Sequence, residues 1–131
     1  MPNSVERILT ENAPKPAGHY SQAVRHGDLV FVSGQLPVTA DGKIAANKSF
    51  EEQARLTLAN LLAIVKAAGS SPENVLKVTV FLAGVEYWPD FNAIYAEIFG
   101  DAKPARSVVP VPALHHGCLI EIEAIAARGE A

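Results

Sequence analysis

Two kinds of side chain in this sequence could do chemistry together. The guanidinium of Arg106 presents a planar fork of donors, which matches a carboxylate through two parallel hydrogen bonds. Glu121 and Glu123 stand two residues apart in an otherwise apolar run, so on a strand both would point to the same side. A carboxylate beside a water molecule can position that water and move protons. The sequence therefore contains a possible anchor for a small acid and a possible proton carrier.

Each of these features also has a structural interpretation, and position alone leaves both open. Arg106 could form an ion pair with one of the 14 acidic residues. Ser33 and Gly34 end a predicted strand, where a glycine lets backbone N–H groups approach a ligand, although such pairs are also common loop formers. Tyr20 could place its hydroxyl over a ligand or simply pack. Glu123 is interpreted as structural.

The sequence gives little support for a metal site, a hydrolase triad or a nucleotide-binding site. The only cluster of metal-ligand residue types is His115-His116-Gly117-Cys118, and adjacent histidines on an extended segment point to opposite faces. We therefore expect a polar loop with one packed cysteine and no metal site. Hydrolase-triad, P-loop and dinucleotide-binding motifs are absent from the sequence.

Composition limits the class of protein. The 131 residues are 49% apolar, which predicts a single domain over residues 1–131. The net charge is -3 and the 11 basic residues are dispersed, which argues against nucleic-acid binding. A lone cysteine is ordinary in a reducing compartment, so a cytoplasmic location is expected. Residues 1–11 lack the features of a signal peptide, and no apolar run reaches the ~20 residues of a membrane span.

The pattern of apolar residues and turns predicts a β-β-α-β-α-β-β order. Ser49 and Glu52 have the spacing of a helix capping box, and Gly69 would end that helix. A second helix would open at Pro89 and stop at Gly100. Predicted strands cover residues 22–25, 29–33, 75–82, 107–111 and 119–124, with a hairpin turn at 26–28. The prediction is an α+β fold.

The strands contain continuous apolar runs, such as residues 29–32 and 78–82, which indicate burial on both faces of the sheet. Two helices can cover only one face. The other face would have to meet another copy of the chain, because monomers rarely expose so large an apolar surface. The pattern therefore predicts a homo-oligomer.

Several sequence blocks together resemble the RidA (YjgF) family of reactive-intermediate deaminases. In chain order they are A-P at 13–14, G-H-Y-S-Q-A at 18–23, V-S-G-Q at 32–35, P-A-R-S at 104–107 and I-E-I-E-A-I-A at 120–126. The resemblance covers about residues 10–127, and the last two blocks are the most characteristic. It implies a chorismate-mutase-like α+β fold, a mixed sheet with two helices on one face, and a homotrimer with ligand clefts between subunits.

The resemblance also implies an activity. This activity is hydrolysis of 2-imino or 2-enamino acids, such as 2-aminoacrylate and 2-iminopropionate, to 2-keto acids and ammonia without cofactor or metal. Arg106 would anchor the substrate carboxylate and Glu121 would activate the water. Tyr20, Ser33, Gly34 and Asn92 fall at family positions near the cleft. The expected partners are this small-molecule ligand and further copies of the chain, with no nucleic acid and no membrane.

The sequence departs from the family pattern at Val108, where many members have cysteine. A catalytic thiol is thereby excluded at this position, and only the backbone of Val108 could contact ligand. The segment at 110–116 also differs, so the rim of the cleft could suit another substrate. Two alternatives stay open: a non-catalytic trimer that binds small metabolites, and an endoribonuclease or translation inhibitor, which the acidic net charge disfavours.

Overall fold

The two long helices begin and end where the local sequence signals predict. In the computed structural model, which describes residues 4–129, helix α1 spans Phe50–Ala67 and helix α2 spans Trp88–Phe99. The Ser49 hydroxyl accepts a hydrogen bond of 3.1 Å from the N–H of Glu52, as a capping residue should. Gly69 and Gly100 follow the two helices with φ of 87° and 59°, a conformation that glycine adopts without strain.

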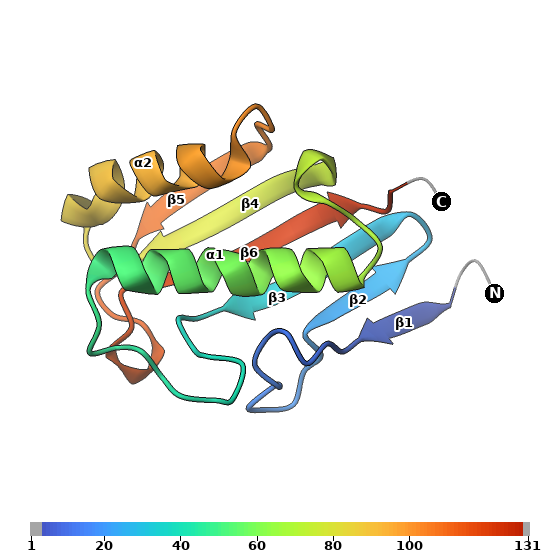
Figure 1. Ribbon diagram of the computed structural model, residues 1–131, viewed down its shortest axis with the longest axis horizontal. Helices are drawn as coiled ribbons and strands as arrows, with labels where there is room; N and C mark the ends of the chain where they lie inside the picture. Colours follow the sequence, from blue (N-terminus) through green and yellow to red (C-terminus); the bar gives the residue numbers. More distant parts are fainter. Residues whose placement is uncertain (1–3, 130–131) are drawn as a thin grey trace.

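Six strands form one mixed sheet in the order β1-β2-β3-β6-β4-β5, and all neighbours are antiparallel except β4 and β5. Both helices lie on the same face of this sheet (Figure 1). The predicted α+β class with two helices on one face is therefore confirmed. The strands are β1 (Val5–Ile8), β2 (Ala23–His26), β3 (Leu29–Gln35), β4 (Val75–Leu82), β5 (Ala105–Pro110) and β6 (Ile120–Ala127).

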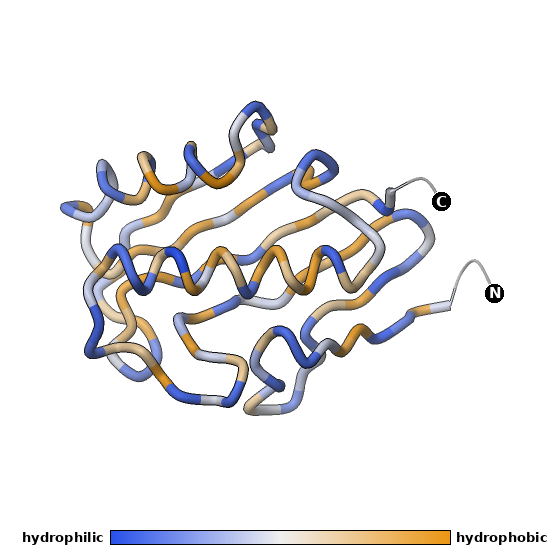
Figure 2. Tube along the Cα trace, in the orientation of Figure 1, coloured by the Kyte–Doolittle hydropathy of each residue, from blue (hydrophilic) through white to orange (hydrophobic). Residues whose placement is uncertain are grey.

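The core lies between the helices and the sheet. Alternate residues of β4 and β6 point into it, including Val78, Val80, Ile120 and Ile122, which are fully buried. Figure 2 shows hydrophobic segments running along these strands and along the helices above them. The residues between them in sequence, Glu121 among them, point to the uncovered face.

Strand β1 was not predicted, so the expected element order lacked its first strand. This strand is four residues long, pairs only with β2 and is mostly exposed, so it carries no apolar alternation that could identify it. Residues 1–3, part of the segment expected not to be a signal peptide, lie outside the described residues. No helix within residues 4–129 is long and apolar enough to cross a membrane.

Strand β5 ends with Pro110 and lies at the edge of the sheet, where a proline leaves no ladder hydrogen bond unmade. The face away from the helices is open in the single chain. Phe31 on this face is 41% exposed, and a shallow cavity of about 200 Å³ lies among Phe31, Lys77, Glu123 and Ile125. This apolar surface is the one that the sequence predicts to meet another copy of the chain.

Candidate functional site

Arg106 lies on β5, opposite Val78 of β4, and its side chain reaches toward α2 on the helix-covered side of the sheet. The guanidinium carbon is 4.8 Å from the ring centre of Tyr95, and it lies 5.7 Å and 5.8 Å from the ring centres of Trp88 and Phe91. One guanidinium nitrogen donates a 3.0 Å hydrogen bond to the side-chain oxygen of Asn92. Aromatic faces and a neutral amide therefore hold this cation in place.

The structural alternative for Arg106, an ion pair, is not observed. Four ion pairs are formed among residues 4–129, and none of them includes Arg106. A cavity of about 430 Å³ adjoins it, lined also by Asn92, Tyr95 and Lys103. Burial raises the pKa of Tyr95 to about 12, although the nearby Arg106 charge acts in the opposite direction. The tyrosine is therefore neutral, and Arg106 keeps its charge unneutralised within the described chain.

Val108 follows Arg106 by two residues and points the same way, opposite the buried Val80. Its side chain is half-buried and packs against the hydrophobic core. It contributes an apolar contact near the arginine and no group that could exchange a proton.

Glu121 lies on the opposite face of the sheet. It stands on β6 between the buried Ile120 and Ile122, opposite Phe81 of β4, and is half-buried. Its carboxylate rests directly against the backbone of Gly34, where a Cβ atom would lie 3.1 Å from the Glu121 carboxyl carbon. The absence of a side chain at Gly34 thus allows this close approach, and no left-handed backbone conformation requires glycine there.

The environment of Glu121 changes its proton affinity. Burial raises the pKa of the carboxyl first, the neighbouring Glu123 charge raises it further, and His115 lowers it by a smaller amount. A carboxyl group shifted upward exchanges its proton closer to neutral pH than an ordinary glutamate. This property suits a group that takes a proton from water and returns it to a leaving group.

Ser33 precedes Gly34 on β3, Tyr20 lines a cavity together with Gly34, and both hydroxyl groups already have hydrogen-bond partners. The Ser33 hydroxyl donates to the backbone oxygen of Ser21 at 2.6 Å. The Tyr20 hydroxyl accepts from the N–H of Ala17 at 3.3 Å, and Tyr20 is 51% exposed. The serine hydroxyl therefore has only acceptor capacity left for a ligand, whereas the tyrosine hydroxyl can still donate.

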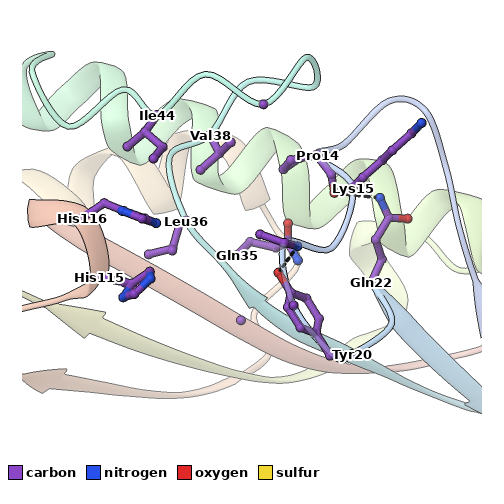
Figure 3. A pocket seen from close by; sticks show the side chains of 14 residues that line it. Pro14, Lys15, Tyr20, Gln22, Gln35, Leu36, Val38, Ile44, His115 and His116 are labelled. Carbon is purple, nitrogen blue, oxygen red and sulfur yellow. Dashed lines mark hydrogen bonds between the residues drawn. The ribbon is translucent and has the colours of Figure 1, made fainter.

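A cavity of about 330 Å³ opens beside these residues (Figure 3). Its lining combines the loop that carries Tyr20, the end of β3 with Gly34, and the turn at His115–Gly117. The buried Gln22 also lines this cavity, and its side-chain amide donates to the carbonyls of Thr10 and Pro14. Gln22 was not predicted as a site residue. Its place where a predicted loop meets a predicted strand was the only signal that its amide could be buried.

The predicted site residues thus form two groups in a single chain. We call Tyr20, Ser33, Gly34 and Glu121 the acid half-site, and Asn92 and Arg106 the arginine half-site. The acid half-site is at β3 and β6, with Glu121 on the open face, while the arginine half-site is on the helix side of the edge strand β5. One chain does not bring the two half-sites together.

The adjacent histidines lie in the expected polar loop beside a packed cysteine, but the loop is a turn and not an extended segment. Residues 115–117 form a 3-10 turn, His116 has φ of 60°, and the ring centres of His115 and His116 are 4.0 Å apart. No group of three or more metal-ligand side chains occurs among residues 4–129. Cys118 is buried, and burial raises the pKa of its thiol, so it is a poor nucleophile.

Comparison with known proteins adds to this geometry. A family model described as Endoribonuclease L-PSP matches residues 10–128. RutC family protein PH0854 of Pyrococcus horikoshii is 46% identical over 121 residues, which cover 92% of this chain and 96% of that protein. TdcF of Escherichia coli, whose name proposes reactive-intermediate deaminase activity, is 42% identical, over 92% of this chain and 95% of its own length.

Solved structures agree with the sequence comparisons. Yeast Mmf1 superposes with a TM-score of 0.92 at 38% identity, covering 96% of this chain and all of the other. Escherichia coli TdcF with bound serine gives a TM-score of 0.89 at 40% identity, with 95% and 99% of the two chains covered. The family model matches residues 10–128 and the solved structures cover nearly the whole of each chain, so this chain belongs to the Endoribonuclease L-PSP family, which comprises the YjgF and RidA proteins.

Proposed function

We propose that this protein hydrolyses 2-imino and 2-enamino acids to 2-keto acids and ammonia. The observation that carries the proposal is Arg106, a half-buried arginine held by aromatic rings and Asn92 with no acidic partner among the described residues. Such a cation is a suitable receptor for a small carboxylate. One related protein supports the choice of ligand: TdcF is named for reactive intermediates, and its solved structure holds an amino acid, serine.

The proposed reaction needs one water and no redox step. The Glu121 carboxylate takes a proton from the water as its oxygen bonds to the C=N carbon, giving a carbinolamine. The carboxyl passes this proton to the imine nitrogen, which makes the carbinolamine neutral. The carboxylate then takes the hydroxyl proton and gives it to the amino nitrogen as the C=O bond forms, the C–N bond breaks and ammonia leaves. The raised pKa of Glu121 fits both steps, since the group must accept and donate near neutral pH.

We further propose that the working site lies between subunits of a homotrimer, in the cytoplasm. The two half-sites lie on opposite sides of one sheet, so a second copy is the simplest source of the missing half. The exposed apolar residues of the open face, Phe31 among them, support a subunit contact there. The free Cys118 thiol fits a reducing compartment.

The direct test generates 2-iminopropionate in solution and measures pyruvate release above spontaneous hydrolysis. We expect Arg106→Ala and Glu121→Ala to lower kcat/KM by roughly 30-fold or more, the cost of removing one side of a charge-assisted contact. Arg55→Ala is the matched control, because Arg55 pairs on the surface with Glu51 and Glu97 and belongs to neither half-site. Wild-type turnover equal to the protein-free rate would refute the activity. Binding of pyruvate without turnover would instead favour the metabolite-binding alternative.

A mixing experiment tests the placement between subunits. Arg106→Ala and Glu121→Ala chains are inactive separately, but co-refolded in a 1:1 mixture they should regain about a quarter of wild-type activity, because about a quarter of the clefts take both intact residues. If one chain holds a complete site, the mixture stays as inactive as its parents.

A further inference from the structure

The cavity beside Tyr20 continues from the acid half-site. Tyr20 and Gly34 line this cavity, and Gly34 is also the residue against which the Glu121 carboxylate rests. A substrate whose reacting carbon lies at Glu121 therefore has this cavity next to it. The substrate's carboxylate would point the other way, toward the arginine half-site of the proposed cleft.

The cavity is much larger than the smallest substrates require. Its volume is about 330 Å³, whereas the methyl group of 2-iminopropionate is comparable to one water molecule, roughly 30 Å³. A cavity of this size accommodates a side chain of several carbon atoms, and water fills only the space that remains around that side chain.

The lining of the cavity is predominantly apolar on one wall. Leu36, Val38 and Ile44 form this wall, and the imidazoles of His115 and His116 lie beside it (Figure 3). No acidic side chain within residues 4–129 contributes to the lining. Lys15 reaches the rim, but its amine extends away from the histidines (Figure 3). Apolar carbon and flat imidazole faces are suited to aliphatic or aromatic groups and provide no fixed charge at the centre.

The apolar wall is held in position by helix α1. The buried Asn60 of α1 donates from its amide nitrogen to the carbonyls of Leu36 and Val38, at 3.3 Å and 2.7 Å. Val38 also pairs with Ile44 in an isolated antiparallel bridge. The wall is thus a preformed surface, which is the condition for selecting a ligand by shape.

We propose that this cavity receives the side chain of the substrate and selects 2-imino acids with a large apolar side chain, branched aliphatic or aromatic. The inference rests on the proposed imine hydrolysis and deepens it by naming the substrate class. Each additional buried carbon then adds to transition-state binding, so selectivity appears in kcat/KM.

The test compares imines generated in solution from alanine, leucine, phenylalanine and glutamate. For the wild type we expect kcat/KM at least tenfold higher for the leucine-derived or phenylalanine-derived imine than for the alanine-derived one. Ile44→Trp fills the cavity from its exposed wall and should lower kcat/KM for the large apolar imines at least tenfold more than for 2-iminopropionate. Lys43→Trp is the matched control, because Lys43 adjoins Ile44 in the same loop without lining the cavity.

Three results would overturn the proposal: equal efficiency with alanine-derived and large apolar imines, a preference for the glutamate-derived imine, or an unchanged substrate preference in Ile44→Trp. If Ile44→Trp does not fold, Ile44→Lys places a charge in the same wall and should reduce use of the large apolar imines equally.

A binding measurement separates this proposal from the proposed activity. Calorimetry with the product analogues 4-methyl-2-oxopentanoate and pyruvate should give tighter binding of the former, lost in Ile44→Trp. That result together with no turnover of any imine would refute the deaminase activity and leave the cavity assignment standing. Equal binding of the two keto acids would refute the cavity assignment whether or not imines are hydrolysed.

Discussion

The contact between Gly34 and Glu121 gives the sharpest prediction. In Gly34→Ala the new Cβ would lie 3.1 Å from the carboxyl carbon and 3.4 Å from Cγ of Glu121, and closer still to one carboxylate oxygen. Ordinary contacts between such atoms begin near 3.5 Å, so the carboxylate must move by about 1 Å. The backbone at Gly34 is not in the left-handed region, so alanine introduces no backbone strain there.

A displacement of this size affects catalysis more than folding. Misplacing a catalytic group by about 1 Å can cost roughly 100-fold in rate, whereas the flexible glutamate side chain can swing aside with a change of less than about 1 kcal/mol in the free energy of unfolding. We therefore expect Gly34→Ala to lower kcat for 2-iminopropionate by roughly 100-fold, measured as pyruvate release, with a nearly unchanged urea midpoint.

A double-mutant cycle decides whether Gly34 acts through Glu121. If it does, Gly34→Ala should have little further effect in the Glu121→Gln background, because the displaced group is already inactive. Equal and additive losses in both backgrounds would refute the reasoning, as would full activity of Gly34→Ala itself.

Three further predictions concern stability. The pKa of Glu121 is raised in the folded chain, so its protonated form contributes stability that is present below pH ~4.3 and is lost as pH rises through the folded-state pKa. Glu121→Gln should thus unfold at a higher urea concentration than wild type at pH 8 and at the same concentration at pH 4. A difference in urea midpoint that is equal at both pH values would contradict this. Ser33→Ala removes the hydroxyl bond to Ser21 and should cost about 1 kcal/mol in the free energy of urea unfolding, so an unshifted midpoint would show that this bond adds nothing. Ser49→Ala removes the cap of α1 and should cost about 1 kcal/mol with unchanged kcat/KM, and an equal loss of activity would show that α1 is coupled to the site.

The sequence predicted correctly those elements that depend on interactions between residues close together in the chain. The Ser49 cap, the glycines at 69 and 100, and the alternation around Ile120 and Ile122 all depend on neighbours within a few residues, and each was confirmed. Strand β1 depends instead on pairing with β2, so its own residues carry little signal.

The candidate site was harder to predict because its contacts join distant segments. The motifs identified Arg106 and Glu121, but not that they lie on opposite sides of the sheet, which follows from the register of β5 and β6 against β4. The aromatic support of Arg106 by Tyr95 and its neighbours comes from packing of α2, which no spacing in the sequence specifies. The close edge-on contact between the rings of His115 and His116 depends on a left-handed residue, His116, which is rare outside glycine.

The wall of the cavity comes from segments outside the strand ladders, whereas Arg106 and Glu121 stand on strands. Residues 36–44 and 115–117 can therefore diverge between related proteins without changing the register of the sheet or the distance between the two reacting groups. Within such a lineage, substitutions in these two segments would reshape the apolar wall of the cavity while the strands stay unchanged. The chemistry would be inherited with the sheet, and specificity would evolve with the loops.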